Sequence, residues 1–398
     1  MSTIDSTAID TSALDALLQQ AADSGAVPGI AAVVSTRDGV IYEGAAGRLH
    51  AADPDAPAVD TSTVFRMASM TKAMASVAAL QLIEEGRLAL DTPVQDVIPA
   101  FGELQVLDGF DGDTPILRAP ARPPVVQDLL THTAGLGYFF SSAKLTKWHE
   151  VTGAPVVLTG LKSSLMAPLI HDPGTIWEYG VNTDWLGMVV EAITGSTLDA
   201  VLQERVFGPL GMDDATFRPT DEQRTRLMGI HSRQADGSLA PAPVDLPPDP
   251  EFAAGGHGSY ATAADHGRFL RALLRGGELD GARILKPETV DLMFTDHIEG
   301  ITQPDGIVSA APELSNDVPA LPIKTGWGLG LALRHERIPG FRAAGSGDWA
   351  GLFNCYYWID RESGLSAAVL TQVLPFFDQK VVETLLAFEL ALYADAPA

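Results

Sequence analysis

The sequence predicts an α/β protein of the α+β type, in which an antiparallel sheet is built from both ends of the chain and a mainly helical region lies between them. Strand patterns occur close to the N-terminus and again over the last third of the chain, with few between. Apolar residues make up 46% of the 398 residues, which suffices for a large core. We therefore expect a discontinuous sheet domain over residues 1–90 and 255–398 and a helical domain over 91–254.

The first ninety residues contain the start of the sheet and one buried helix. Residues 11–23 predict a helix with a Ser or Thr cap. Residues 29–34 and 40–44 predict two strands, and Asp38-Gly39 between them favours a hairpin turn. Residues 70–85 contain neither Gly nor Pro and are apolar on almost every side, which indicates a helix inside the core.

Two long loops interrupt the rest of the chain. Residues 233–254, called the covering loop below, carry five prolines, and residues 296–322 are rich in Gly, Pro and polar residues. Long loops often cover binding sites. The other patterns predict helices over 261–274 and 286–294, strands over 327–333, 352–359 and 365–370, and a closing helix over 381–393.

Charge and composition exclude several classes of function. The net charge is −25 with only 26 Lys and Arg, so we expect no nucleic-acid partner and no anionic membrane partner. No apolar run approaches the ~18 residues of a membrane span. The opening residues 1–5 carry no basic residue and no apolar run follows, so we expect no export signal and a cytoplasmic protein.

Metal and redox chemistry have no support in the residue pattern. The single cysteine, Cys355, excludes an internal disulfide, and its apolar neighbours indicate a buried thiol. The nine histidines show no metal-ligand spacing. We expect no metal and no cofactor.

Ser69-Met70-Thr71-Lys72 carries the chemistry that the sequence indicates most strongly. The hydroxyl and the amine stand at i and i+3, so they lie on one face of the helix. A serine hydroxyl needs a base to become a nucleophile, and burial among apolar residues disfavours the ammonium form of Lys72. A second match, Ser141-Ser142-Ala143-Lys144, lies on a mixed polar segment and is set aside. The pattern predicts an acyl-enzyme formed on Ser69.

Further motifs accompany this pair. They are Phe65-Arg66-Met67-Ala68 before Ser69, Leu129-Leu130-Thr131-His132-Thr133-Ala134-Gly135-Leu136, Pro173-Gly174-Thr175-Ile176-Trp177-Glu178-Tyr179 and Phe207-Gly208-Pro209-Leu210-Gly211-Met212. Together they resemble the class C β-lactamase-related serine hydrolases over residues from about 28 to 390. Within that superfamily the resemblance is to the family VIII carboxylesterases. The resemblance implies a serine β-lactamase/penicillin-binding-protein-like fold with the active site in a cleft between the sheet and an all-helical domain.

The resemblance also implies roles for residues of the helical domain. Tyr179 matches a family tyrosine that relays protons between the nucleophile and the leaving group. The lactamases carry Asn two residues later, whereas here Val181 holds that place and Asn182 follows, so Asn182 is a shifted candidate for a substrate contact. His132 is implied to be structural, and no Gly-x-Ser-x-Gly elbow supports a Ser-His-Asp site.

Two segments compete for the family's third element, a Lys-Thr-Gly on a strand beside the site. Lys324-Thr325-Gly326 matches the letters, whereas Trp349-Ala350-Gly351 leads into the strand pair where the element belongs. A Trp at the lysine position offers apolar surface and one N–H in place of a cation, which favours a neutral ester. By position, the Leu352 and Ser69 backbone N–H groups are the candidates for an oxyanion hole. His257, in a glycine-rich turn, is a further candidate for substrate binding.

These residues predict a carboxylesterase that acts on short-chain acyl esters, with a small-molecule ester as its substrate. A β-lactamase or D-Ala-D-Ala peptidase is the alternative if Lys324 holds the third element. An acyltransferase on the same site stays open because acceptor choice depends on the loops. A catalytically silent ligand-binding module is the alternative outside enzymes. The sequence predicts neither acyl length nor oligomeric state.

Overall fold

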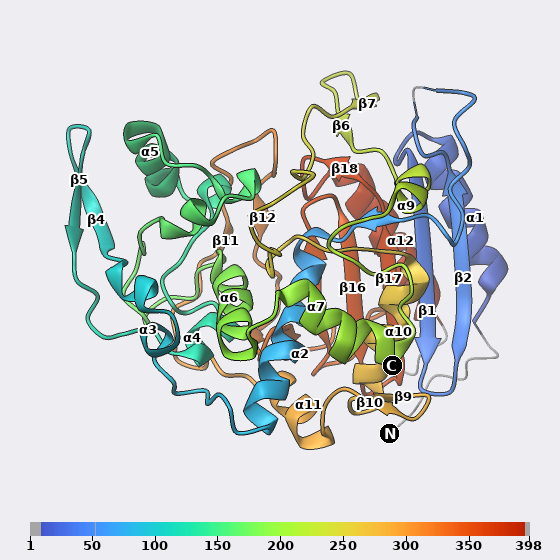
Figure 1. The fold of residues 1–398 in the computed structure, drawn as a ribbon. Coiled ribbons are helices and arrows are strands. Elements are labelled where there is room, and N and C mark those ends of the chain that lie inside the picture. Colours follow the sequence, from blue (N-terminus) through green and yellow to red (C-terminus); the bar gives the residue numbers. More distant parts are fainter. Residues whose placement is uncertain (1–8, 52, 395–398) are drawn as a thin grey trace.

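A seven-stranded sheet and a helical lobe beside it form the molecule (Figure 1). The structure, a computed structural model, describes residues 9–51 and 53–394; the opening residues used to predict that no export signal is present lie outside them. All neighbouring strands of the sheet are antiparallel, and strands from both ends of the chain are adjacent, as the sequence predicts. The strand order is β13 (Thr325–Trp327), β14 (Ala332–Arg334), β15 (Gly347–Gly351), β16 (Cys355–Asp360), β17 (Leu365–Leu370), β1 (Gly29–Thr36) and β2 (Val40–Gly47).

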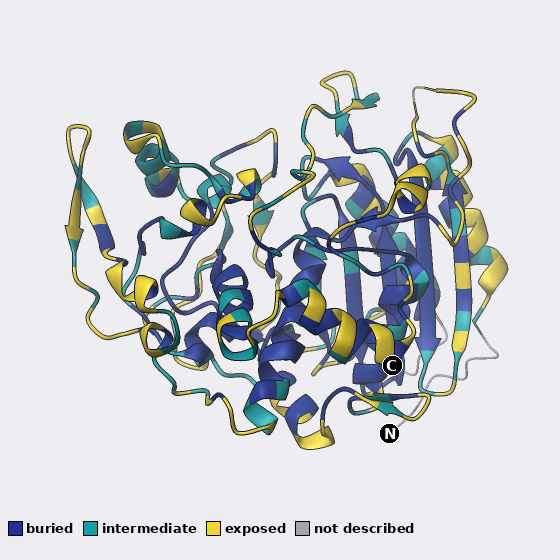
Figure 2. Cartoon of the chain, viewed as in Figure 1, coloured by how far each residue is buried: buried dark blue, intermediate teal, exposed yellow. Residues whose placement is uncertain are grey.

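Helices cover both faces of the sheet, so β1 is buried along almost its whole length. Helices α1 (Thr11–Asp23) and α12 (Gln379–Leu392) pack together over one face. Helix α10 (Ala263–Leu274) packs on β1 and β17 from the other face. Gly267 permits this close packing, because a Cβ there would lie 2.9 Å from Val33 Cγ2. Figure 2 shows the buried strands between helices that are exposed on their outer sides.

Helix α2 (Thr71–Glu84) lies between the sheet and the helical lobe, where it packs against α6 (Asn182–Thr194) (Figure 1). Every residue from Thr71 to Leu80 is buried. The prediction of a core helix over residues 70–85 is therefore confirmed. This position brings the first turn of α2 to the boundary between the sheet and the helical lobe.

Two local predictions were wrong. The stretch predicted as one strand over 327–333 is a hairpin of β13 and β14, because the chain turns at Gly330, whose φ is +92°. The mainly helical region also contains the hairpin β4 (Val106–Asp111) and β5 (Thr114–Arg118), which is largely exposed and so lacks an apolar alternation. Helix α1 is capped by Asp10, whose carboxylate accepts from the Ser12 and Ala13 N–H groups.

The remaining elements are short. The helices are α3 (Val94–Val97), α4 (Val126–Leu130), α5 (Ala143–Thr152), α7 (Leu198–Leu202), α8 (Gly208–Leu210), α9 (Asp221–Thr225) and α11 (Pro287–Met293), with a π-helical turn at Gln203–Phe207. The strands are β3 (Phe65–Arg66), β6 (His231–Arg233), β7 (Leu239–Pro241), β8 (Tyr260–Ala261), β9 (Glu278–Leu279), β10 (Ala282–Arg283), β11 (Gly306–Ile307), β12 (Val318–Pro319) and β18 (Val373–Leu374). Both predicted long loops are largely irregular, and the expected helices at 261–274, 286–294 and 381–393 are present.

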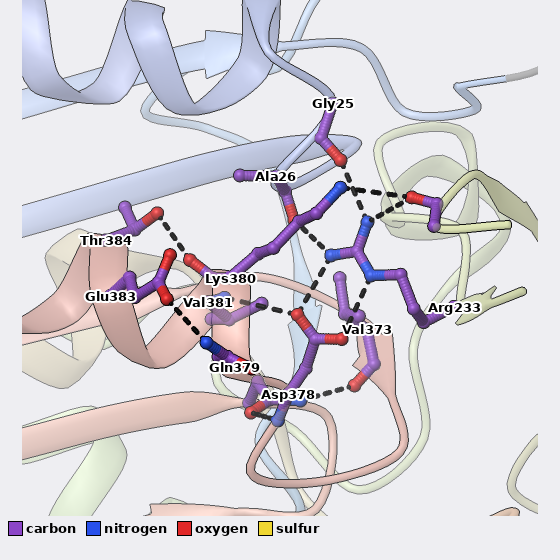
Figure 3. A network of polar contacts seen from close by, with 12 residues as sticks. Gly25, Ala26, Arg233, Val373, Asp378, Gln379, Lys380, Val381, Glu383 and Thr384 are labelled. Carbon is purple, nitrogen blue, oxygen red and sulfur yellow. Dashed lines mark hydrogen bonds and ion pairs between the residues drawn. The ribbon is translucent and has the colours of Figure 1, made fainter. Parts of the chain in front are cut away.

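An ion pair ties the start of the covering loop to both ends of the chain (Figure 3). Arg233 donates to both carboxylate oxygens of Asp378, each over 2.9 Å. The same guanidinium donates to the Gly25 and Ala26 carbonyls, which follow the end of α1 in the sequence. Asp378 also caps α12 by accepting from the Val381 N–H. One arginine, whose side chain is 11% exposed, therefore fixes α1, α12 and the covering loop relative to one another.

Among the described residues, no single helix is long and apolar enough to cross a membrane. One bent pair of helical segments, Asn182–Thr194 with Leu198–Leu210, passes on length and composition alone. Three of its large apolar side chains, Leu186, Val189 and Leu198, are fully buried inside the protein.

Candidate active site

Ser69 lies in a 3₁₀ turn, Ala68–Met70, that leads directly into α2. Ala68 adopts a φ of +45°, which strains a residue that has a Cβ and is typical of functional turns. Strand β15 runs close beside this turn, and Gly351 is needed there because a Cβ would lie 2.5 Å from the Met67 carbonyl oxygen. The Ser69 side chain is therefore held between the start of the core helix and the sheet.

Lys72 is the buried centre of the site. Its Nζ lies 3.0 Å from Ser69 Oγ, 3.0 Å from the Tyr138 hydroxyl and 2.8 Å from the Gly256 carbonyl oxygen. The side chain is 1% exposed. The amine thus has a direct contact with the serine hydroxyl, which is the geometry that proton transfer between them requires.

Two tyrosines face this lysine in different ways. Tyr138 contacts Nζ through its hydroxyl, and burial together with the nearby Asp184 carboxylate raises the pKa of Tyr138 well above its usual range. Tyr179 presents its ring, whose centroid is 4.7 Å from Nζ. The Tyr179 hydroxyl oxygen instead accepts from Trp349 Nε1 over 3.2 Å. The structure therefore brings the predicted Tyr179 to the site and adds Tyr138, which the sequence reasoning missed.

The two candidates for the third element lie at different places in the sheet. Trp349 and Gly351 lie on β15, and Leu352 follows at its end, beside the turn that carries Ser69. Lys324 is exposed and precedes β13, the edge strand, with β14 between it and β15. Trp349, Gly351 and Leu352 line the same cavity as Ser69, whereas Lys324 is not among its lining residues.

His132 and Asn182 have structural environments. Asn182 is fully buried, and its amide nitrogen lies 3.0 Å from His132 Nδ1 and 3.3 Å from the Leu136 carbonyl oxygen. The predicted substrate contact of Asn182 has no support in this geometry, because its amide nitrogen is used inside the helical lobe and the residue does not line the cavity. His132 accepts the Glu178 N–H through its carbonyl, and burial, with the charge of Lys72, lowers the pKa of His132 well below its usual value. The His132 backbone therefore positions the segment that carries Tyr179.

A buried carboxylate stands behind the lysine. Asp184 accepts the Gly256 N–H over 2.9 Å, and its Oδ1 lies 3.4 Å from His257 Nδ1, an ion-pair separation with poor hydrogen-bond alignment. Burial opposes the ionisation of Asp184, but His257 and Lys72 hold the pKa of its carboxyl below the usual value. The glycine turn at Gly256 is thereby fixed so that its carbonyl faces Lys72.

Ser69 opens onto two cavities. The larger has a volume of about 500 Å³ and is walled mostly by apolar side chains, with Trp349, Tyr179 and residues of the 303–322 segment among them. The smaller, about 20 Å³, also contains Ser69 and includes the predicted His257 in its wall. Within the described residues no group of histidine, cysteine and carboxylate side chains is arranged to hold a metal ion.

Sequence patterns give little indication of Tyr138 and Asp184. Tyr138 follows Gly135-Leu136-Gly137 at the end of the Leu129 motif, so an aromatic residue after a glycine turn is the one available hint. Asp184 lies on α6 among apolar residues, where an unpaired charge is costly and therefore indicates a specific partner.

The fold and this serine–lysine site define a serine hydrolase or acyltransferase built on the β-lactamase fold. The β-lactamase family model matches residues 14–391, and the chain belongs to that family. It is 32% identical to a lovastatin esterase of Penicillium rubens over 380 residues, covering 91% of this chain and 93% of the relative. It is 33% identical to monacolin J acid methylbutanoyltransferase of Aspergillus terreus over 353 residues, or 85% and 84% of the two chains.

Solved structures share the fold along nearly the whole chain. Unliganded simvastatin synthase (LovD) from Aspergillus terreus superposes with a TM-score of 0.84 and 28% sequence identity, covering 99% of both chains. A penicillin-binding protein homologue from Caulobacter crescentus superposes with a TM-score of 0.67 at 20% identity, covering 100% of this chain and 98% of the other. The expected serine β-lactamase/penicillin-binding-protein-like fold is confirmed.

Proposed function

We propose that the protein is a carboxylesterase that cleaves short-chain acyl esters of bulky apolar alcohols through an acyl-enzyme on Ser69. The observation that carries this proposal is the 3.0 Å contact between Ser69 Oγ and the buried Lys72 Nζ at the edge of a large apolar cavity. An alcohol with an extended apolar body fits that cavity by size and by polarity. The lovastatin esterase among the relatives supports the same reaction class.

The proposed first half-reaction joins the acyl group to the enzyme. Ser69 Oγ passes its proton to Lys72 Nζ as it bonds to the ester carbonyl carbon. The backbone N–H groups of Ser69 and Leu352 receive the negative charge that forms on the carbonyl oxygen. The bond to the alcohol oxygen then breaks, and that oxygen takes a proton from Lys72 directly or through Tyr179.

The second half-reaction reverses these transfers with water. A water molecule gives one proton to the same lysine and tyrosine groups, and its oxygen bonds to the carbonyl carbon. The bond to Ser69 Oγ breaks, Ser69 regains its proton, and a carboxylic acid leaves. The number of protons on the enzyme is unchanged over the cycle.

An acyltransferase is the second candidate function, since an alcohol in place of water would complete the same chemistry. The apolar wall around Ser69 supports it, because such a wall favours an apolar acceptor over water. The methylbutanoyltransferase among the relatives supports it equally. A β-lactamase or D-Ala-D-Ala peptidase has less support, because Trp349 offers no cation at the place where the resemblance puts a lysine.

Hydrolysis of p-nitrophenyl acetate and butyrate, measured beside a chromogenic cephalosporin with wild type and Ser69→Ala, tests the proposal. We expect ester turnover that is lost in the variant, with the cephalosporin left intact. Release of p-nitrophenol faster than release of free acid when a hydrophobic alcohol is added would favour the acyltransferase. Ester turnover that survives in Ser69→Ala would overturn the mechanism. Failure of wild type to react with a serine-directed phosphonate would favour a silent binding module.

A further inference from the structure

The smaller cavity is a separate compartment beside Ser69. It shares Ser69, Phe140 and Leu352 with the large cavity but has a wall of its own, in which apolar side chains dominate. Its volume of about 20 Å³ is close to the space of one water molecule. The residues of that wall are Ala68, Tyr138, Leu158, Leu246, His257 and Phe353.

An acyl-enzyme needs separate room for the acyl chain and for the alcohol, since both extend from the same carbonyl carbon. The two cavities differ greatly in size, at about 500 and 20 Å³. The large cavity suits a bulky alcohol, so the small compartment is left for the acyl chain. Its dimensions favour an acetyl group, and longer chains enter only if its wall opens.

One wall residue, Leu246, belongs to the covering loop and follows Asp245, which forms an ion pair with Arg66. Asp245 binds Arg66 through two contacts of 2.6 Å, from Nε to Oδ1 and from Nη2 to Oδ2. The same Asp245 Oδ1 accepts the N–H of Leu246 over 2.6 Å. The carboxylate therefore fixes the backbone of Leu246, the next residue, whose side chain closes the compartment.

The other half of the ion pair belongs to the segment that carries the nucleophile. Arg66 lies on β3, three residues before Ser69, and its side chain is 8% exposed. It also donates to the Met228 carbonyl over 2.8 Å. Arg66 is thus a fixed point, whereas Asp245 is 57% exposed on the loop. The pair joins the loop to the framework of the active site.

The covering loop also contacts the chain next to Leu158, a second apolar residue in the wall of the compartment. The covering loop packs on Gly160, where a Cβ would lie 2.7 Å from Pro247 Cγ, and the Glu251 N–H donates to the Gly160 carbonyl over 2.9 Å. Leu158 lies in the 3₁₀ turn Val157–Thr159 just before Gly160. The same loop therefore holds two of the apolar residues that limit the compartment.

We propose that the Arg66–Asp245 ion pair sets the acyl-chain length by holding Leu246 against the compartment beside Ser69, so that the enzyme prefers acetyl esters to esters of longer acids. This inference rests on the proposed esterase function and names the acyl part of its substrate. Loss of the ion pair releases the loop and admits longer chains. Leu246 and Asp245 act on selectivity, and the hydrogen bonds of the Asp245 carboxylate go to Arg66 and to the Leu246 N–H.

Chain-length profiles of four variants test this inference. The kcat/KM values for p-nitrophenyl acetate, butyrate and octanoate are compared for wild type, Leu246→Ala, Leu246→Trp, Asp245→Asn and the control Asp249→Asn. Asp249 is on the same loop but pairs with Arg218 in solvent, with 87% of its side chain exposed. We expect the octanoate-to-acetate ratio to rise about tenfold in Leu246→Ala and Asp245→Asn. The butyrate-to-acetate ratio falls in Leu246→Trp, and the control keeps the wild-type profile.

Leu246→Ala and Leu246→Trp are expected to shift the preference for longer acyl chains in opposite directions. General damage to the fold would not produce opposite shifts at one position. Equal profiles in wild type, Leu246→Ala and Asp245→Asn, with Ser69-dependent acetate hydrolysis intact, would overturn the inference and leave the proposed function standing. An equal shift in Asp249→Asn would also overturn it, because any weakened loop would then suffice. Absence of ester hydrolysis in wild type would instead overturn the proposed function, and the acyl assignment with it.

Discussion

The indole N–H of Trp349 lies 3.2 Å from the hydroxyl oxygen of Tyr179, and this contact joins the sheet to the helical lobe at the active site. Trp349 is on β15, whereas Tyr179 comes from the segment positioned by His132. The two rings are also in contact, with centroids 4.9 Å apart. The hydroxyl therefore has a fixed donor on one side, and the ring faces Lys72 on the other.

Trp349→Phe removes the N–H and keeps an aromatic ring. We expect kcat for p-nitrophenyl butyrate to fall about tenfold or more, since a hydrogen bond to a group that gains charge during the reaction is lost. Steady-state kinetics measure this effect. Trp148→Phe, on α5, is the control and should retain wild-type kcat. Unchanged kcat in Trp349→Phe would show that the contact orients nothing that the reaction needs.

The two tyrosines at Lys72 are distinguished by their hydroxyl groups. Tyr179→Phe is expected to lower kcat by about 10²–10⁴-fold, the contribution typical of a proton-transferring side chain. Tyr138→Phe removes the 3.0 Å contact with Lys72 Nζ and should cost about tenfold, because it orients the amine. Single-turnover rates of acylation measure both. A larger loss in Tyr138→Phe than in Tyr179→Phe would transfer the relay role to Tyr138.

The helix that carries the Ser69–Lys72 pair could be predicted because its information is local. The i, i+3 spacing and the unbroken apolar run need only the 3.6-residue period of a helix. The strand pairs of the C-terminal half likewise follow from short apolar runs with turns between them. The turn between β13 and β14 could not be predicted, because Gly328 and Gly330 stand inside an apolar run that has the pattern of a single strand.

Asp184, Gly256 and Tyr138 could not be predicted to meet, because their contacts depend on tertiary packing. Asp184 is 72 residues from Gly256 in sequence, and Lys72 is 66 residues from Tyr138. No local periodicity encodes such pairs. Asn182 illustrates the converse: its place after Tyr179 suggested a substrate contact, but α6 begins there and turns the side chain toward His132.

Asn182→Ala should therefore act on stability and leave substrate binding unchanged. Removing the amide leaves the Leu136 carbonyl and His132 Nδ1 without this buried donor, which costs about 1–3 kcal/mol. Urea unfolding measures the loss, and KM for p-nitrophenyl butyrate should stay within about twofold of wild type. A large rise in KM with unchanged unfolding would restore Asn182 as a substrate contact.

Asp265, in the first turn of α10, gives a pH effect on stability that runs opposite to ordinary acid unfolding. Burial raises the pKa of Asp265 to about 6 from 3.8, although Thr262 donates to its carboxylate. The folded state thus holds more protons between these two values, so this group's contribution to the free energy of unfolding falls as the pH rises from about 4 to 6. Above that window the cost reaches about 3 kcal/mol.

Asp265→Asn removes this cost and keeps an oxygen that can accept the Thr262 N–H. We expect the variant to be more stable than wild type at pH 8, with the difference shrinking toward zero at pH 4. Urea unfolding across this range measures it. Thr262→Ala, which removes the other half of the capping box, should cost about 1 kcal/mol at pH 4 and more at pH 8, because the Thr262 side chain also lowers the pKa of Asp265. A difference between Asp265→Asn and wild type that does not vary with pH would mean that Asp265 titrates alike in both states, and that the helix N-terminus offsets its burial.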